Sequence, residues 1–441
     1  ISKGLVGSEM CIRDSCEFLH ESRQTTIEHK AHRQKKPKEK CFDKALFRIF
    51  VRVSSLLPVS LILILLLPVV IAENKQVELS IETSIADYDI GITNAAIAPD
   101  GSSVLIVGND GYSHLISAKN PGDRSLDVEL NSARDNNLND VAWHPRGEAA
   151  LIAGDFGTAL RYEKIDHSVT IVNGTGAILG RDMSAVAWRS AGDYAYFGSD
   201  DGSLWRFSEG TGFLNLGNDG DSKVTGISCH LNYDLCVVST ISSGLGVIGP
   251  THNITWISGT KTNTWIDVDC PDAQLNECVA FASGLRMISI QLNTVDHTKS
   301  SVGNMVEYRT LEGDFIAASR GYSSSSIIYL APSGTVRYDP LNDVAKVQIS
   351  SSQMAEWDSV VAGRQISYVW ENDFNSGFML TSNGNIIAFE PYQIEIENTM
   401  LTTIILAAVT ISVPGVIIGL IYMNSPFLQR KYKQLMKRKS K

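Results

Sequence analysis

The chain has 441 residues, of which 44% are hydrophobic and 20% are charged, so it is too apolar for wholesale disorder and too long for one average domain. The formal net charge of −10 is unevenly distributed: residues 1–72 carry +5, residues 73–398 carry −22 and residues 399–441 carry +7. An acidic body excludes ordinary nucleic-acid binding, which needs a basic face, so we expect no nucleic-acid partner. The 35 glycines favour a turn-rich β protein over a helical one.

Two N-terminal segments precede the acidic body. Residues 1–15 resemble translated sequencing-adapter sequence, and the rest of 1–53 is a polar, basic tract that we predict to be disordered. The uncharged run at 54–72 follows basic residues and ends in a small residue, Ala72, which is the pattern of a cleaved signal peptide. The alternative is an uncleaved N-terminal anchor helix, because the run approaches the ~20 residues that a membrane-spanning helix needs.

The C-terminal region predicts a transmembrane helix with a basic tail. Residues 399–423 carry no charge and suffice to cross the ~30 Å hydrocarbon layer, and the tail 424–441 carries seven basic residues, which stay on the cytoplasmic side. We therefore expect a single-pass protein of the cell membrane, with the body outside and the C-terminus in the cytoplasm. Lys437 and Lys439 also match an endoplasmic-reticulum retrieval pattern, which would place a eukaryotic chain in that membrane, although a plain stop-transfer cluster explains the same lysines.

A repeat of 40–50 residues runs through the body. Each copy consists of an apolar strand, a turn, an alternating apolar strand, a second turn with glycine and a third strand. The copies lie at 95–117, 141–163, 186–208, 227–249, 268–291, 316–340 and 366–390. The second-turn glycines are Gly111, Gly157, Gly202, Gly244, Gly284, Gly334 and Gly384. Glycine recurs there because a tight hairpin turn needs a positive φ angle.

This repeat predicts an all-β fold, a seven-bladed β-propeller of four-stranded antiparallel blades over 73–395. A single blade cannot bury both of its faces, but blades packed radially can. Outer strands are predicted at 167–174, 252–258 and 343–350. An apolar residue also stands three positions before each of the first five copies: Ile92, Leu138, Met183, Val224 and Trp265. The ring must close, because an open array would expose two apolar faces and unpaired edges.

The strand–turn rhythm of IAPDGSSVLIVGNDG and VAWHPRGEAALIAGDFGTALRY resembles WD-repeat propellers and related exported propeller proteins. The resemblance covers roughly 90–395 and is strongest in the first three copies. It departs from true WD repeats, because no Gly-His dipeptide opens a blade and Tyr162-Glu163, Phe207-Ser208 or Tyr338-Asp339 replace the Trp-Asp pair. It implies the fold and a general role as a binding platform, and no individual site residue.

Four cysteines flank the first hairpin turn of two successive copies: Cys229, Cys236, Cys270 and Cys278. Facing residues of an antiparallel pair lie within disulfide reach, so we predict the bonds Cys229–Cys236 and Cys270–Cys278 in an exported domain. The alternative joins Cys229 to Cys270 between blades. The spacing within each pair is too wide for a zinc knuckle.

Two tripeptides, Asn173-Gly-Thr and Asn253-Ile-Thr, match the acceptor pattern for N-glycosylation. We treat both asparagines as candidate modification sites on the outer surface of the propeller.

The sequence contains no catalytic motif for acyl or phosphoryl transfer, and the G-x-G-x-x-G match at 244–249 has no helix after it. We therefore predict no catalytic residue, no metal site and no cofactor. The leading hypothesis is a membrane-anchored, extracytoplasmic, non-enzymatic propeller that binds a protein or surface polymer at one face, in the assembly or stabilisation of envelope complexes. The alternative is an extracellular propeller hydrolase or lyase such as a glycosidase, which would place two carboxylates or clustered arginines near the axis.

Overall fold

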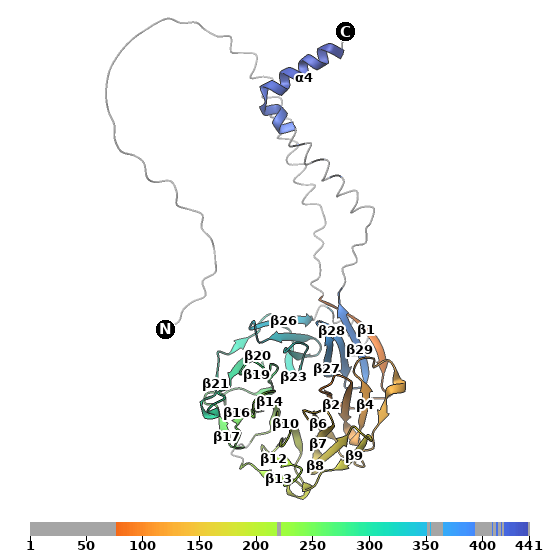
Figure 1. Cartoon of the computed structure of the whole chain (residues 1–441), viewed down its shortest axis with the longest axis vertical. Helices are drawn as coiled ribbons and strands as arrows, with labels where there is room; N and C mark the ends of the chain where they lie inside the picture. Colours follow the sequence, from red (N-terminus) through yellow and green to blue (C-terminus); the bar gives the residue numbers. More distant parts are fainter. Residues whose placement is uncertain are drawn as a thin grey trace, which may run out of the picture. The chain divides into compact units, whose positions relative to one another are not determined.

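The second strand of each repeat consists almost wholly of apolar and small residues, as in SVLIVG at 103–108 and AALIAG at 149–154. Every residue of these two strands is buried. A strand buried on both faces needs a neighbouring layer on each side. The computed structural model, which describes residues 76–217, 222–350, 353, 365–392, 408, 412, 416 and 419–439, provides those layers as seven sheets packed face to face in a ring (Figure 1).

Each blade is an antiparallel sheet whose strands follow one another from the axis to the rim. The inner strands are β2 (Ile92–Ile97), β6 (Leu138–Trp143), β10 (Met183–Trp188), β14 (Val224–Cys229), β18 (Trp265–Asp269), β23 (Asp314–Arg320) and β27 (Ile366–Asp373). The second strands are β3 (Ser103–Gly108), β7 (Ala149–Gly154), β11 (Ala195–Ser199), β15 (Cys236–Thr240), β19 (Glu277–Ala282), β24 (Ser326–Ala331) and β28 (Ser376–Thr381). The third strands are β4 (Ser113–Ser117), β8 (Thr158–Glu163), β12 (Leu204–Ser208), β16 (Leu245–Ile248), β20 (Arg286–Gln291), β25 (Thr335–Asp339) and β29 (Asn385–Pro391). The outer strands are β5 (Val128–Glu129), β9 (Ser168–Ile171), β13 (Gly212–Asn215), β17 (Ile254–Trp256), β21 (Ser301–Val302), β26 (Val344–Ile349) and β1 (Val77–Ser84), and β22 (Val306–Glu307) also pairs with β20.

This arrangement confirms the predicted all-β, seven-bladed propeller. The three outer strands expected from the sequence are β9, β17 and β26. Short 3₁₀ turns interrupt the loops: η1 (Asn109–Gly111), η2 (Arg124–Leu126), η3 (Asp155–Gly157), η4 (Thr175–Ala177) and η5 (His297–Lys299).

The apolar core consists of seven clusters, one between each pair of neighbouring blades. The cluster between the first two blades, for example, joins Leu105 and Val107 of β3 to Leu138 of β6 and Ile152 of β7. Another joins Ile106 in the first blade to residues of the last, so the ring closes through apolar packing as well as through its strands. Burial of these apolar side chains between the blades stabilises the ring by about 25 cal/mol for each Å² of apolar surface removed from water.

The inner strand of every blade contains a β-bulge after its first residue or two. In the second and third blades the extra residue turns its side chain toward the next blade. Asn139 thus donates to the carbonyl of Met183 at 2.9 Å, and Ser184 donates to the carbonyl of Val224 at 2.6 Å. Each bond links one inner strand to the next, so the inner ring is held by directional contacts in addition to the apolar core.

The ring is closed by β1, which precedes the first repeat and supplies the outer strand of the last blade. β1 pairs antiparallel with β29 from Val77 opposite Pro391 to Ser84 opposite Asn385. Its apolar side chains, Val77 and Leu79, are buried in the cluster between the last two blades. The repeat pattern requires a closed ring but carries no sign of this strand.

The turns between second and third strands lie at the same end of the ring as the connections between blades, and we call this end the loop face. All seven turn glycines have positive φ angles, from +72° at Gly111 to +128° at Gly334. At Gly157, a Cβ atom would lie 2.5 Å from the carbonyl oxygen of Ile178, so both the φ angle and the space require glycine. The close approach also brings neighbouring loops into contact on this face.

The helical part of the predicted fold class was wrong. Within the described residues, no helix is long and apolar enough to cross a membrane. The described residues of the predicted span, 408, 412, 416 and 419–423, are helical, and the basic tail forms α4 (Pro426–Lys439), whose 14 residues include six basic ones, so α4 is too short and too charged to span a bilayer. The signal or anchor segment 54–72, and most of the expected transmembrane helix 399–423, lie outside the described residues.

Candidate functional site

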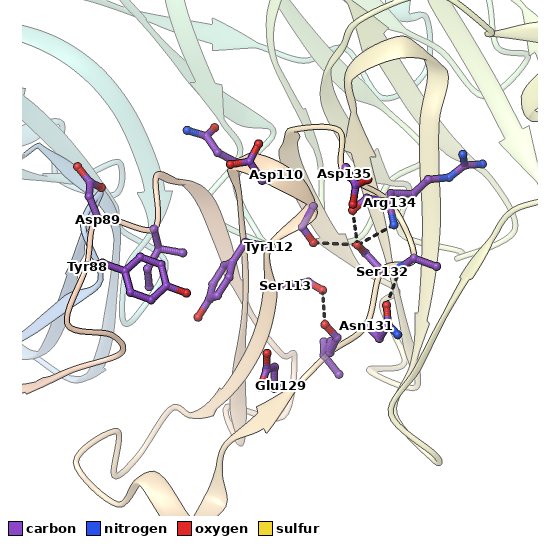
Figure 2. Close-up of a pocket in the computed structure, with 15 residues that line it drawn as sticks. Tyr88, Asp89, Asp110, Tyr112, Ser113, Glu129, Asn131, Ser132, Arg134 and Asp135 are labelled. Atoms are coloured by element: carbon purple, nitrogen blue, oxygen red, sulfur yellow. Dashed lines mark hydrogen bonds between the residues drawn. The ribbon is translucent and has the colours of Figure 1, made fainter.

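Three loops around the first blade enclose a pocket of about 660 Å³ on the loop face (Figure 2). Its walls come from 88–90, before β2, from 109–113, between β3 and β4, and from 129–135, which leads from β5 to the second blade. These stretches are separate in sequence, but alternate turns of an antiparallel meander lie at the same end of the sheet. The propeller therefore assembles the pocket from segments that share no local motif.

Hydrogen bonds fix the walls of this pocket to one another. The backbone N–H of Asn109 donates to the carbonyl of Gly91 at 3.0 Å, which joins the hairpin turn to the connection that enters the blade. On the other side, the hydroxyl of Ser132 donates to the carbonyl of Gly111 at 2.8 Å (Figure 2). The pocket is thus held in shape by the protein itself, as is usual for binding sites.

Two tyrosines stand at the mouth of the pocket, and Figure 2 shows their rings next to each other. Tyr88 is 70% exposed, whereas Tyr112 is half-buried and stacks on His114 with ring centroids 6.0 Å apart. Burial raises the pKa of the Tyr112 hydroxyl. The charge of Arg124 opposes this rise, and the smaller contributions of Tyr88 and Glu129 add to it. The Tyr112 hydroxyl is therefore a neutral hydrogen-bond donor at physiological pH, and the face of the Tyr112 ring is electron-rich.

Acidic side chains dominate the pocket wall. Four carboxylates line it, from Asp89, Asp110, Glu129 and Asp135, against one guanidinium, from Arg134. Figure 2 shows that the guanidinium points away from the tyrosine rings, so the interior near the rings is left to the carboxylates. A concave, negatively charged surface concentrates cations and repels anions.

Two smaller hollows continue the pocket along the loop face. One, of about 360 Å³, shares Tyr88 and Asp89 with it and extends to Asn383 in the last blade. The other, of about 210 Å³, shares Arg134 with it and extends to Phe156 and Leu179 in the second blade. The three hollows form a row from the last blade to the second, which we call the loop-face groove.

Phe156 occupies a strained position at the end of the loop-face groove. It is the middle residue of the turn D-F-G, and its φ and ψ angles of 55° and 32° are left-handed. The equivalent residue of the first blade, Asp110, has nearly the same angles, but Asp tolerates this region better than Phe does. A bulky residue there costs on the order of 1–3 kcal/mol. The ring of Phe156 is 65% exposed, so burial returns little of that cost.

Two buried carboxylates, Asp140 and Asp267, lie on inner strands, next to the axis of the propeller. Asp140 accepts hydrogen bonds from Asn94 at 2.7 Å, from its neighbour Val141 at 2.8 Å and from Val186 at 2.7 Å, so both of its oxygens are used. Asp267 accepts N–H groups at both oxygens in the same manner. Burial raises the pKa of each to about 7. These carboxylates link blades, and their oxygens are already engaged by the protein.

The predicted cysteine pairs form, with Cys229 bonded to Cys236 and Cys270 bonded to Cys278. Both bonds lie at the turn between inner and second strands, at the opposite end of the ring from the loop face. The inter-blade alternative, Cys229 with Cys270, is therefore wrong. Within the described residues, no group of three or more His, Cys, Asp or Glu side chains is placed to hold a metal ion.

The glycosylation candidates are both exposed. Asn173 follows β9, on the connection that also carries Thr175 of the loop-face groove, whereas Asn253 precedes β17 at the opposite end of the strands. The two sites are thus on different ends of the propeller, and modification of either stays a prediction.

The residues of the loop-face groove do not stand out in the repeat pattern. Tyr88 and Glu129 lie outside the seven repeat segments, so comparison of repeats could not align them. One signal was available: the turns N-D-G and D-F-G hold the same place in the first two copies, and Phe156 replaces an acidic residue that suits the left-handed backbone. An apolar ring where the repeat favours a small polar residue points to a role outside the core.

Comparison with known proteins supports the fold and does not identify a family. No protein-family model and no curated protein sequence matches the chain. Several solved propellers do. A catalytically inactive variant of virginiamycin B lyase from Staphylococcus aureus, solved with quinupristin, has a TM-score of 0.54 and 11% identity over 72% of this chain and 100% of its own.

Two further structures show the same likeness without that activity in their names. The β-propeller domain of Cps50 (Swd1) from Myceliophteria thermophila has a TM-score of 0.54 and 8% identity over 72% of this chain and 100% of its own. YCF48 bound to the D1 peptide has a TM-score of 0.50 and 10% identity over 73% of this chain and 96% of its own. At such identities the likeness establishes the propeller fold alone, which serves both enzymes and binding proteins.

Proposed function

We propose that this protein is a non-catalytic binding module that takes up a basic, extended segment of a partner protein in the loop-face groove. The observation that carries the proposal is the pocket of Figure 2, which is concave, preformed, flanked by two tyrosines and lined by four carboxylates against one guanidinium. Tyrosines that line a concave site are often among the few residues that supply most of the binding energy. The row of three hollows suits an extended chain better than a compact small molecule.

A binding role accounts for the carboxylates near the axis better than hydrolysis does. A propeller glycosidase would need a free acid and a free base at the reacting bond. Asp140 and Asp267 instead accept N–H groups from Val186 and Ala318 of the following blades. A surface polysaccharide with anionic groups would also be repelled from the groove, so a basic polypeptide is the occupant that the charge favours.

The two disulfides support a location in an oxidising, extracytoplasmic compartment. Such bonds persist outside the cytosol and are rare within it. Both are formed here between facing residues of a hairpin. We therefore place the partner of this propeller in the same compartment, where the module would hold together components of a larger assembly.

The test is binding of the full chain to an array of immobilised peptides that differ in net charge, at low and high salt. We expect selective retention of basic peptides, weakened by salt, because the contact is electrostatic in part. Asp110→Asn combined with Asp135→Asn should reduce retention, whereas Asp166→Asn, at the opposite end of the strands, should not. Equal retention of acidic and basic peptides, or a preference for acidic polysaccharide, would refute the proposal.

A further inference from the structure

The loop-face groove is chemically different at its two ends, and this difference defines its ligand. We propose that it recognises a two-part motif in which a lysine or arginine side chain enters beside Tyr88 and Tyr112, and an apolar side chain packs against Phe156 and Leu179. This inference rests on the proposed function and narrows it from basic segments in general to a specific arrangement of two side chains.

The first part of the motif follows from the pocket between 88 and 135. Cations bind to the faces of aromatic rings, and the attraction increases when water is excluded. Tyr112 offers such a face from a half-buried position, and Tyr88 offers a second that is mostly exposed. Glu129 lines this pocket together with both tyrosines, so a carboxylate is available for the head of the incoming side chain. Arg124, whose charge also acts on the Tyr112 hydroxyl, lies outside the pocket lining and is ion-paired with Asp127.

The second part follows from the apolar end of the groove. Phe156 and Leu179 are 65% and 76% exposed, and both line the same hollow. The left-handed backbone of Phe156 opposes folding and its ring contributes little to the core, so the ring has no evident purpose within the free protein. An apolar side chain of a partner would cover both residues and remove their surface from water.

Arg134 determines which part of the motif goes to which end. It lines both hollows, and its guanidinium points away from the tyrosine rings (Figure 2). A cationic side chain would be repelled at the Phe156 end and attracted at the Tyr112 end. The two parts of the motif are therefore not interchangeable, and the peptide binds in one direction.

The test uses fluorescence anisotropy of the full chain with labelled Gly/Ser peptides that carry one lysine and one leucine at separations of one to five residues. Tyr88→Ala should weaken binding about 5- to 10-fold, whereas Tyr88→Phe, which keeps the ring face, should bind nearly as well as the wild type. Replacement of the peptide lysine by norleucine should abolish the difference between these two variants.

Phe156→Asn probes the other end, because Asn is well tolerated at a left-handed position. The variant should be at least as resistant to thermal unfolding as the wild type, yet bind the leucine peptide about 5-fold more weakly. It should bind a peptide with serine in place of leucine as the wild type does. These two results together would separate a binding role from a structural one.

The outcomes distinguish this inference from the function on which it rests. If basic peptides bind and Asp110→Asn with Asp135→Asn weakens them, but Tyr88→Ala and Phe156→Asn change nothing, the two-part motif is refuted while the binding function stands. If Tyr88→Phe weakens binding as much as Tyr88→Ala, the ring face is not the contact and the motif is again refuted. If no basic peptide binds at any salt concentration, both proposals fail.

Discussion

Asp140 on the inner strand of the second blade accepts the backbone N–H of Val186 on the inner strand of the third, at 2.7 Å. Asp267 does the same for Ala318, three blades further round the ring, at 2.9 Å. The charge of Asp140 also contributes to the raised pKa of Asp267, after burial and the nearer charge of Asp269. Two buried acids at equivalent places thus join blades and share the surroundings of the axis.

These acids make the stability of the ring depend on pH. The folded state holds the pKa of Asp140 near 7, against 3.8 for an ordinary aspartate such as one in the unfolded chain, so the folded protein binds more protons between these limits. The free energy of unfolding should therefore fall as pH rises from 4 to 7, by up to about 1.4 kcal/mol per pH unit for each such group. Chemical denaturation at several pH values measures this slope.

Asp140→Asn isolates the contribution of one acid. The amide cannot titrate, so the variant should show a shallower fall between pH 4 and 7, and its loss of stability relative to the wild type, which comes from one lost N–H acceptor, should be largest near pH 4. Asp166→Asn, at an exposed turn, should leave the slope unchanged in this window because the pKa of Asp166 is lowered rather than raised. Identical slopes for Asp140→Asn and the wild type would show that Asp140 does not titrate in this range.

The closing strand β1 should contribute strongly to stability, although it precedes the repeats. Leu79 is 6% exposed and lies in the cluster between the last two blades. Leu79→Ala should reduce the free energy of unfolding by about 2–4 kcal/mol, because it leaves a cavity where the ring closes. Ser80→Ala, on the exposed side of the same strand, should change it by less than ~0.5 kcal/mol. Equal effects would mean that β1 does not close the ring.

Two turn glycines allow the cost of steric overlap to be separated from the cost of a positive φ angle. Gly101 and Gly111 have φ angles of 65° and 72°, but a Cβ at Gly101 would meet nothing within 4 Å, whereas at Gly111 it would overlap the carbonyl oxygen of Arg134. Gly101→Ala should cost about 1 kcal/mol, for the angle alone. Gly111→Ala should cost at least ~2 kcal/mol more, because two loops must move apart. Thermal unfolding of both variants measures the difference.

The disulfides should stabilise the propeller locally. The Cys229–Cys236 bond joins residues only seven apart, so its removal by the double change to alanine should cost about 2 kcal/mol. A reducing agent should lower the unfolding midpoint of the wild type by more than that of the double variant, which retains only Cys270–Cys278. No effect of reductant on either protein would mean that these bonds do not form in solution.

The sequence predicted the number of blades because the repeat is strong where packing is strong. The second strands are buried on both faces and keep their apolar character in every copy, and glycine adopts the positive φ angle of the turns at the lowest cost. β1 could not be predicted, because its sequence, VELSIETS, lies before the first copy and resembles any half-buried strand. Its partner, β29, is some 300 residues away, and only the closure of a ring selects it.

The groove could not be predicted because no short segment contains it. Tyr88 and Tyr112 come from two different loops and Glu129 from the end of β5, and each looks like an ordinary surface residue in its own context. The fold brings them together at one end of the strands. The transmembrane prediction failed in the opposite way, because a short segment alone suggested a feature. The uncharged run is long enough to span a bilayer, but no helix among the described residues is long and apolar enough to do so.

The most direct test of the proposed function is hydrogen–deuterium exchange of the full chain with and without a saturating basic peptide selected from the array. We expect slower exchange in 88–91, 109–113, 129–137 and 155–158, with little change at the turns on the opposite end, such as 164–167. Protection confined to that opposite end or to the outer strands, with none in the groove segments, would contradict it.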